Sequence, residues 1–236
     1  MKTGLEIVFE DDQIIAVNKP AGVLSIPDRA NVQPSLKSEL QKKYGDIFVV
    51  HRIDKPTSGL IVFAKNAEAH KALSALFLSR EMSKKYVALV NGTIYPESGT
   101  VDAAIAEHPA NNGTMIVHQK GKASITDYQT VEKFPQYSLV EYQIHTGRTH
   151  QIRVHTKYLG HAIVGDELYG DGKPLYVSQI RKDFKLSKLS EDEQPILNRL
   201  ALHSYKMDFV LFDKEYHLEA PLWKDMRATL QQLRKK

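Results

Sequence analysis

The pattern of hydrophobic and polar positions changes period several times along this chain. Apolar or alternating stretches bounded by turn residues are typical of strands. They fall at residues 5–22, 84–94, 140–144, 201–212 and 216–220. The acidic pair Asp11 and Asp12 divides the first stretch, which therefore predicts two short strands that end at the Lys19-Pro20 break.

Three other stretches predict helices. Residues 67–78 repeat apolar side chains at helical spacing. Residues 149–160 predict a second helix, with Thr149 as its N-cap and Gly160 just past its end. Residues 222–236 predict an amphipathic, basic helix. Because the strands and helices lack a strict βαβ rhythm, the predicted fold class is α+β rather than a doubly wound sheet.

Residues 171–198 are polar and have no clear periodicity, so we expect them to be an insertion rather than core. The chain has no internal repeat, low-complexity tract or clean linker. We therefore expect one domain that spans residues 1–236.

Composition narrows the class of protein. Of the 236 residues, 42% are hydrophobic and 25% are charged, as in ordinary soluble proteins. No apolar run approaches the roughly 20 residues of a membrane helix. The N-terminus turns acidic where a signal peptide would be apolar, which predicts a cytoplasmic protein with no membrane partner. The absence of cysteine excludes disulfides, thiol catalysis and Cys-ligated metals.

Charge is distributed unevenly. The net charge is +4, but no acid occurs between Glu141 and Asp166, where Arg148, Arg153 and Lys157 lie among four histidines. Such a local excess is typical either of a nucleic-acid-binding surface or of an ordinary solvated one.

Metal and nucleotide cofactors find no support in the sequence. His145, His150 and His155 are spaced by five, which brings them together on neither a strand nor a helix. There is no HExxH, GxGxxG, GxxxxGK[ST] or GxSxG. We predict no metal and no cofactor, and interpret the histidines as structural or ligand-facing.

The remaining candidate for a catalytic group is a carboxylate. Asp54 lies in HRIDKPTSGL, where Pro56 and Gly59 place it in a loop, and loops commonly carry catalytic groups. An aspartate beside a guanidinium stays ionised and can serve as nucleophile or general base. The alternative is that Asp54 only caps the loop.

Residues 51–66, HRIDKPTSGLIVFAKN, resemble the signature of the RluA-type pseudouridine synthases. Four further segments resemble motifs of the same family in the same order. They are EDDQIIAVNKPAGVL (10–24), KKYVALVNG (84–92), IHTGRTHQIRVHTKYLGHAIVGDELYG (144–170) and RLALHSYKMDF (199–209).

The resemblance implies a single catalytic domain whose mixed, mainly antiparallel sheet carries a central cleft flanked by helices. It implies an isomerase that breaks the N1–C1′ bond of a uridine and rejoins the base through C5, without metal or cofactor. The RNA partner would be a stem-loop of ribosomal RNA or tRNA, and the enzyme would act as a monomer with no obligate protein partner.

The resemblance also implies roles for seven residues. Asp54 would attack or deprotonate the ribose, Arg153 would pair with it, and Tyr86 would stack on the target base. Leu202 would form the floor of the base pocket. Arg52 would be a wedge that enters the stack as the nucleotide flips out, while Arg148 and His150 would bind phosphates at a helix start.

One departure is that many relatives begin with a small S4-type RNA-binding domain, which we do not expect here because the chain starts directly with the catalytic strands. Two rival hypotheses remain. A non-catalytic RNA-binding protein on the same fold would be expected to lack the aspartate. A glycoside hydrolase usually needs a second acid near the first, and none accompanies Asp54 in the matched motifs.

Overall fold

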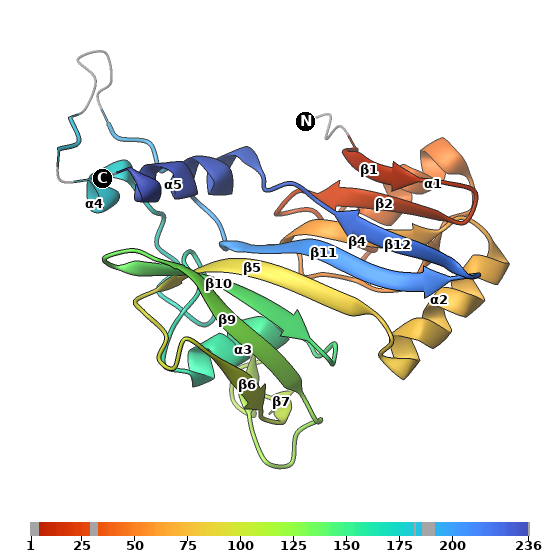
Figure 1. The fold of residues 1–236 in the computed structure, drawn as a ribbon, viewed down its shortest axis with the longest axis horizontal. Coiled ribbons are helices and arrows are strands. Elements are labelled where there is room, and N and C mark those ends of the chain that lie inside the picture. Colours follow the sequence, from red (N-terminus) through yellow and green to blue (C-terminus); the bar gives the residue numbers. More distant parts are fainter. Residues whose placement is uncertain (1–4, 29–32, 182, 186–191, 236) are drawn as a thin grey trace.

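The computed structural model describes residues 5–28, 33–181, 183–185 and 192–235 (Figure 1). Its strands are β1 (Ile7–Glu10), β2 (Ile14–Lys19), β3 (Phe48–Val49), β4 (Ser58–Ala64), β5 (Ser83–Asn91), β6 (Ser98–Asp102), β7 (Ile105–Glu107), β8 (Met115–Val117), β9 (Ile125–Lys133), β10 (Tyr137–Ile144), β11 (Leu202–Leu211) and β12 (Lys214–Glu219). Its helices are α1 (Leu36–Tyr44), α2 (Ala67–Ser79), α3 (Gln151–Tyr158), α4 (Val177–Ile180) and α5 (Lys224–Arg234). Within these ranges no helix is long and apolar enough to cross a membrane.

Most strands join one mixed sheet. Its main path is β1-β2-β4-β11-β5-β10-β9-β6, with β3 added to β4 and β12 to β11, while β7 and β8 form a separate pair. The β4–β11 pair is parallel and the other strand pairs are antiparallel. The predicted α+β class with a mixed, mainly antiparallel sheet is therefore confirmed.

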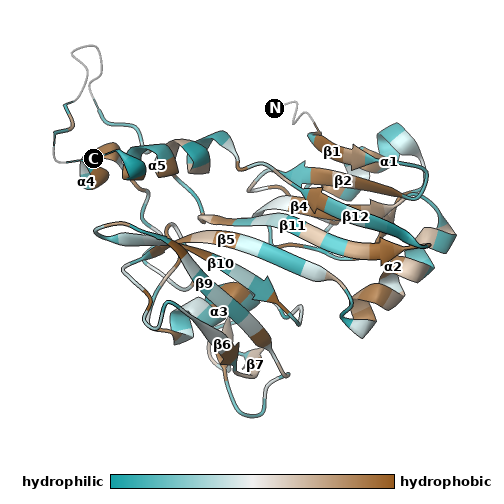
Figure 2. Cartoon of the chain, in the orientation of Figure 1, coloured by the Kyte–Doolittle hydropathy of each residue, from teal (hydrophilic) through white to brown (hydrophobic). Residues whose placement is uncertain are grey.

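Strands β2 and β4 are covered on both faces. Alternate residues of β4 belong to different cores: Leu60 and Val62 pack with α2, whereas Ile61 and Phe63 pack with α1. This follows from the two-residue period of a strand. It explains why both strands consist largely of apolar residues, and Figure 2 shows the hydrophobic colour along β2. A third core joins β5 and β10 to α3 and α5.

The parallel contact of β4 with β11 requires a glycine. Gly59 has φ +111, and a Cβ atom there would lie 2.0 Å from the backbone oxygen of Ser204. Only glycine tolerates both this conformation and this close approach. The loop that contains Asp54 is thus anchored directly beside β11.

The predicted helices are present, with one correction. The helix predicted at 149–160 is α3, but its N-cap is His150 in the left-handed conformation (φ 56), without a side-chain cap, so Thr149 as the cap is wrong. The prediction also missed the helices α1 and α4 and the strands β3, β4 and β6 to β9.

The two ends of segment 171–198 lie close together. Leu175 and Leu197, near its two ends, bridge each other and are buried in the core. Between them, α4 packs against α5. Part of the segment lies outside the described residues, and its assignment as an insertion in a single domain stays a prediction.

Candidate active site

Asp54 lies in a short, firmly held loop between β3 and β4. The Ser25 hydroxyl donates to the backbone oxygen of Ile53 (2.7 Å), and the Lys19 ammonium donates to the backbone oxygen of Lys55 (3.2 Å). The Lys19 ammonium also donates to Val23 and Pro20 oxygens at 2.8 and 3.0 Å. The residues on either side of Asp54 are therefore held by the last residue of β2 and by the segment that follows it.

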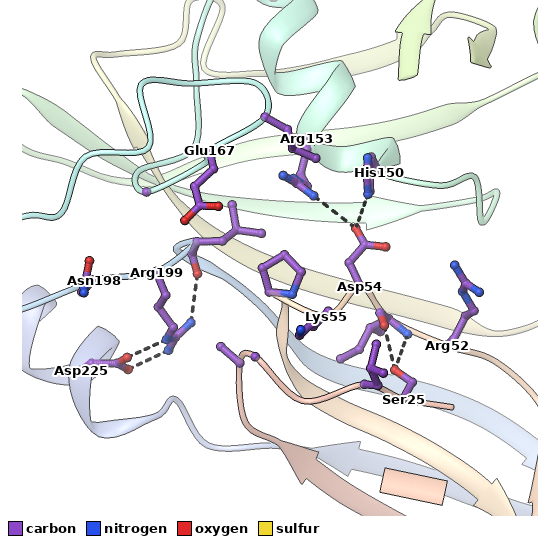
Figure 3. Close-up of a pocket in the computed structure, with 18 of the residues that line it drawn as sticks. Ser25, Arg52, Asp54, Lys55, His150, Arg153, Glu167, Asn198, Arg199 and Asp225 are labelled. Atoms are coloured by element: carbon purple, nitrogen blue, oxygen red, sulfur yellow. Dashed lines mark hydrogen bonds and ion pairs between the residues drawn. The ribbon is translucent and has the colours of Figure 1, made fainter. Parts of the chain in front are cut away.

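The Asp54 carboxylate faces two nitrogen groups from α3 (Figure 3). Its Oδ2 lies 3.9 Å from Arg153 Nη1 and 3.9 Å from His150 Nε2, and the side chain stays 22% exposed. The Asp54 carboxylate is thus close to a guanidinium but open on one side. Of the two arginines weighed from the sequence, Arg153 is the one that faces Asp54.

Arg153 is bound more tightly to Asp166 than to Asp54. Its Nε and Nη2 donate to the two carboxylate oxygens of Asp166 at 2.8 and 2.6 Å, and both side chains are almost fully buried. Burial alone would lower the pKa of Arg153, but the hydrogen bonds and charge of Asp166, with the charge of Asp54, raise it. Asp166 therefore fixes the guanidinium, which leaves Nη1 directed at Asp54.

His150 is positioned by Tyr169. The Tyr169 hydroxyl accepts from the backbone N–H of Met115 (2.8 Å) and lies 2.8 Å from His150 Nδ1. If the hydroxyl donates its one hydrogen to Nδ1, the hydrogen of neutral His150 is on Nε2, which faces Asp54. Burial lowers the pKa of His150, partly opposed by the charge of Asp54. This side chain faces Asp54, whereas the sequence placed it with Arg148 at phosphates.

Tyr86 and Leu202 come from neighbouring strands. Tyr86 on β5 lies opposite Ser204 of β11, two residues after Leu202. Burial raises the pKa of Tyr86 to about 12, with the Ser204 hydrogen bond opposing and the Asp54 charge assisting. Its hydroxyl therefore keeps its proton at neutral pH.

All seven residues predicted from the sequence line one pocket with a volume of about 220 Å³. They are Arg52, Asp54, Tyr86, Arg148, His150, Arg153 and Leu202. Arg52 is exposed beside the mouth, and Arg148 is tied by its Nε to the backbone oxygen of Ala123 (3.0 Å). The structure thus brings these residues together from four separate segments.

A larger cavity of about 1270 Å³ adjoins Asp54 on its other side (Figure 3). There Arg199 forms a two-bond ion pair with Asp225 (2.6 and 2.7 Å) and also donates to the Ser58 hydroxyl (3.2 Å). Sequence reasoning missed Arg199, Asp166, Tyr169 and Lys19. Asp166 and Tyr169 lie inside the longest motif, and Asp166 ends the acid-free stretch, but no pattern showed which cation it contacts.

The three equally spaced histidines have different partners. His145 contacts Asp127, His150 contacts Tyr169, and His155 is buried against the Thr126 hydroxyl. Over the described part of the chain, no group of three or more His, Asp or Glu side chains could hold a metal ion.

Comparisons with known proteins agree on one family. A family model described as RNA pseudouridylate synthase matches residues 13–158. The chain is 42% identical over 192 residues to a dual-specificity RNA pseudouridine synthase RluA of Vibrio vulnificus, covering 78% of this chain and 76% of the relative. It is 36% identical over 238 residues to a ribosomal large subunit pseudouridine synthase D of Nitrosomonas europaea, covering 98% and 65%.

A solved structure has a similar fold. The human RNA pseudouridylate synthase domain containing 4 is 28% identical and has a TM-score of 0.74. The match covers 97% of this chain and 93% of the human chain.

Proposed function

This chain belongs to the RNA pseudouridylate synthase family and is of the RluA type, and on that premise we propose that it isomerises uridines of RNA in the pocket around Asp54. The observation that carries this proposal is the placement of an ionisable carboxylate 3.9 Å from both Arg153 and His150. That carboxylate lies in a pocket that Tyr86 and Leu202 also line.

Asp54 acts on the ribose of the flipped uridine, as nucleophile at the sugar or as the base that removes a sugar proton. In either case the N1–C1′ bond breaks, the uracil turns, and a C5–C1′ bond forms. The proton leaves C5 and N1 gains one, so atoms balance without an added reactant. Arg153, itself fixed by Asp166, holds positive charge 3.9 Å from the Asp54 carboxylate.

The remaining side chains hold the substrate. Tyr86 stacks on the uracil, and Leu202 forms the apolar floor. Arg52, exposed at the mouth of the pocket, enters the RNA stack as the nucleotide leaves it, because a stacked base cannot reach a recessed carboxylate. Arg148 binds backbone phosphate at the rim.

The substrate is a stem-loop, since sequence-specific RNA recognition generally uses unstacked loop nucleotides. One relative is named a dual-specificity RNA pseudouridine synthase, and another a ribosomal large subunit pseudouridine synthase. We place large-subunit ribosomal RNA first and tRNA second. The enzyme works in the cytoplasm as a monomer, as one domain with 171–198 inserted, and without metal or protein partner.

Mapping pseudouridines in ribosomal RNA and tRNA from cells with and without the gene tests the proposal. One or a few sites should disappear with the gene. They should return with the parent gene and stay absent with Asp54→Asn. Identical maps in all strains would overturn the proposed activity, and release of free uracil from RNA would indicate hydrolysis instead.

A stem-loop of roughly 20 nucleotides around a mapped site tests local recognition. It should be a competent substrate in excess EDTA. Modification of only intact ribosomal particles or full-length tRNA would overturn local recognition and direct attention to residues 171–198.

A further inference from the structure

A second hollow opens beside the pocket of Asp54. It has a volume of about 490 Å³ and shares Arg52, Tyr86 and Arg148 with that pocket. Its wall is completed by the end of α2 and by the first residues of β5. Four cationic side chains line it: Arg52, Arg80, Lys84 and Arg148. Among the described residues, none of its lining side chains is a carboxylate.

Lys84 is the unusual member of this hollow. Its residue is only 7% exposed, yet in the described part of the chain its ammonium has no carboxylate or hydrogen-bond acceptor. It lies 5.4 Å from the centre of the Phe77 ring, next to Arg80. Burial and the charge of Arg80 lower the pKa of Lys84. The ammonium nitrogen is not fully buried but reaches the hollow. An anionic ligand bound there supplies the counter-ion that the protein does not.

The position of Lys84 relates this hollow to the reaction. Lys84 and Tyr86 are two residues apart on β5 and both are buried, so their side chains share one face of the strand. Lys85 points to the other face and is neutralised by Glu141 at 2.9 Å. The adjacent lysine thus has a protein counter-ion, whereas Lys84 does not.

We propose that Lys84 and Arg80 bind one backbone phosphate of the nucleotide next to the flipped uridine, within one nucleotide's span of Tyr86. The phosphate supplies the counter-ion that the protein lacks at this point, and it sets which nucleotide stands over the pocket of Asp54. This inference rests on the proposed RNA substrate but not on the chemistry assigned to Asp54.

Binding of a fluorescein-labelled RNA stem-loop with a single loop uridine tests the site by anisotropy. Lys84→Met keeps the length and apolar stem of the side chain, and it should weaken binding about tenfold, as for one charge-assisted hydrogen bond. The slope of log affinity against log salt should fall by about 0.7 to 0.9, the value for one phosphate contact. Lys85→Met is the matched control and should leave both quantities unchanged.

Stability separates ligand binding from a structural role. Lys84→Met removes a cation that has no protein counter-ion and keeps the apolar stem of the side chain, so its urea midpoint should equal or exceed that of the parent. Equal losses of affinity in the two lysine variants, or an unchanged salt slope in Lys84→Met, would overturn the proposal. Arg80→Gln, at an exposed position, should lower affinity and slope in the same way and tests the site even if Lys84→Met folds poorly.

Replacing the loop phosphates one at a time by methylphosphonate locates the contact. At one position next to the uridine, the neutral linkage should weaken binding to the parent about tenfold but cause no further loss in Lys84→Met. If every position weakens both proteins equally, the phosphate site is wrong. This experiment measures binding, so its result does not depend on the chemistry assigned to Asp54. If the protein isomerises uridine but Lys84→Met binds RNA as tightly as the parent, only this inference is overturned.

Discussion

Arg153 and Lys84 are both buried cations beside the same pocket, but their surroundings differ. The side chain of Arg153 is 3% exposed, and its guanidinium donates two hydrogen bonds to Asp166. The ammonium of Lys84, in a residue 7% exposed, has no carboxylate partner among the described residues. A cation with its own counter-ion is fixed before substrate arrives, which suits an orienting group. A cation without a counter-ion is stabilised most by an anionic ligand.

The largest effect is expected from Asp54, the group that the fixed cation faces. Asp54→Asn keeps the shape of the side chain but removes the charge, so the single-turnover isomerisation rate should fall at least about 10³-fold, while RNA affinity changes less than about twofold. Rapid-quench measurement of pseudouridine gives the rate and anisotropy gives the affinity. A variant that retains a substantial fraction of the parent rate would remove Asp54 from the mechanism.

Removing the counter-ion of Arg153 should have the next largest effect, which is a loss of stability. Asp166→Ala leaves a buried guanidinium facing Asp54 alone, and we expect a loss of about 3–5 kcal/mol in the free energy of unfolding. Urea denaturation measures it. Lys85→Met breaks a partly exposed ion pair and should cost less than about 1 kcal/mol. Similar losses in the two variants would show that the Arg153–Asp166 pair is no more than an ordinary surface contact.

Acid should destabilise the protein through His51, which lies beside Lys84. Its Nε2 accepts from the backbone N–H of Val62 (3.0 Å), and burial, with the charge of Lys84, lowers its pKa to about 3. As pH falls from 6.5 towards 3, the unfolded chain binds a proton that the folded chain does not. Stability contributed by this group is therefore lost on acidification, by at most about 1.4 kcal/mol per pH unit.

Urea unfolding between pH 7 and pH 5 tests this linkage. His51→Gln should show a shallower loss of stability than the parent. Lys84→Met should also be slightly shallower, because it removes a charge that opposes protonation. A parent and a His51→Gln variant with the same pH slope would contradict the assignment.

The smallest effect is expected at the rim. The guanidinium of Arg148 is already bound to the backbone oxygen of Ala123, so Arg148→Ala should weaken RNA binding only a few-fold and lower the salt slope by about 0.7 to 0.9, as for one phosphate. Anisotropy at several salt concentrations measures both. An unchanged slope would place Arg148 away from RNA.

The sequence by itself determined the family and the location of most of the pocket. Five motifs in order identified an RluA-type pseudouridine synthase. Local signals found three helices: apolar spacing for α2, amphipathic character for α5, and flanking residues for α3, although its predicted cap Thr149 was wrong. Those motifs also contain all seven predicted residues, each of which lines the pocket. The prediction missed the helices α1 and α4 and the strands β3, β4 and β6 to β9, where it had marked no element.

Only the tertiary structure decided which groups are partners. Asp166 is 13 residues from Arg153, and Arg80 caps the end of α2 while Lys84 is the second residue of β5. Their contacts depend on how separate segments pack, which no local pattern encodes. The left-handed cap at His150 likewise depends on the turn that brings its ring to Tyr169. Two lysines adjacent in the sequence, Lys84 and Lys85, differ for the same reason: a strand turns them to opposite faces, and Glu141 pairs with Lys85.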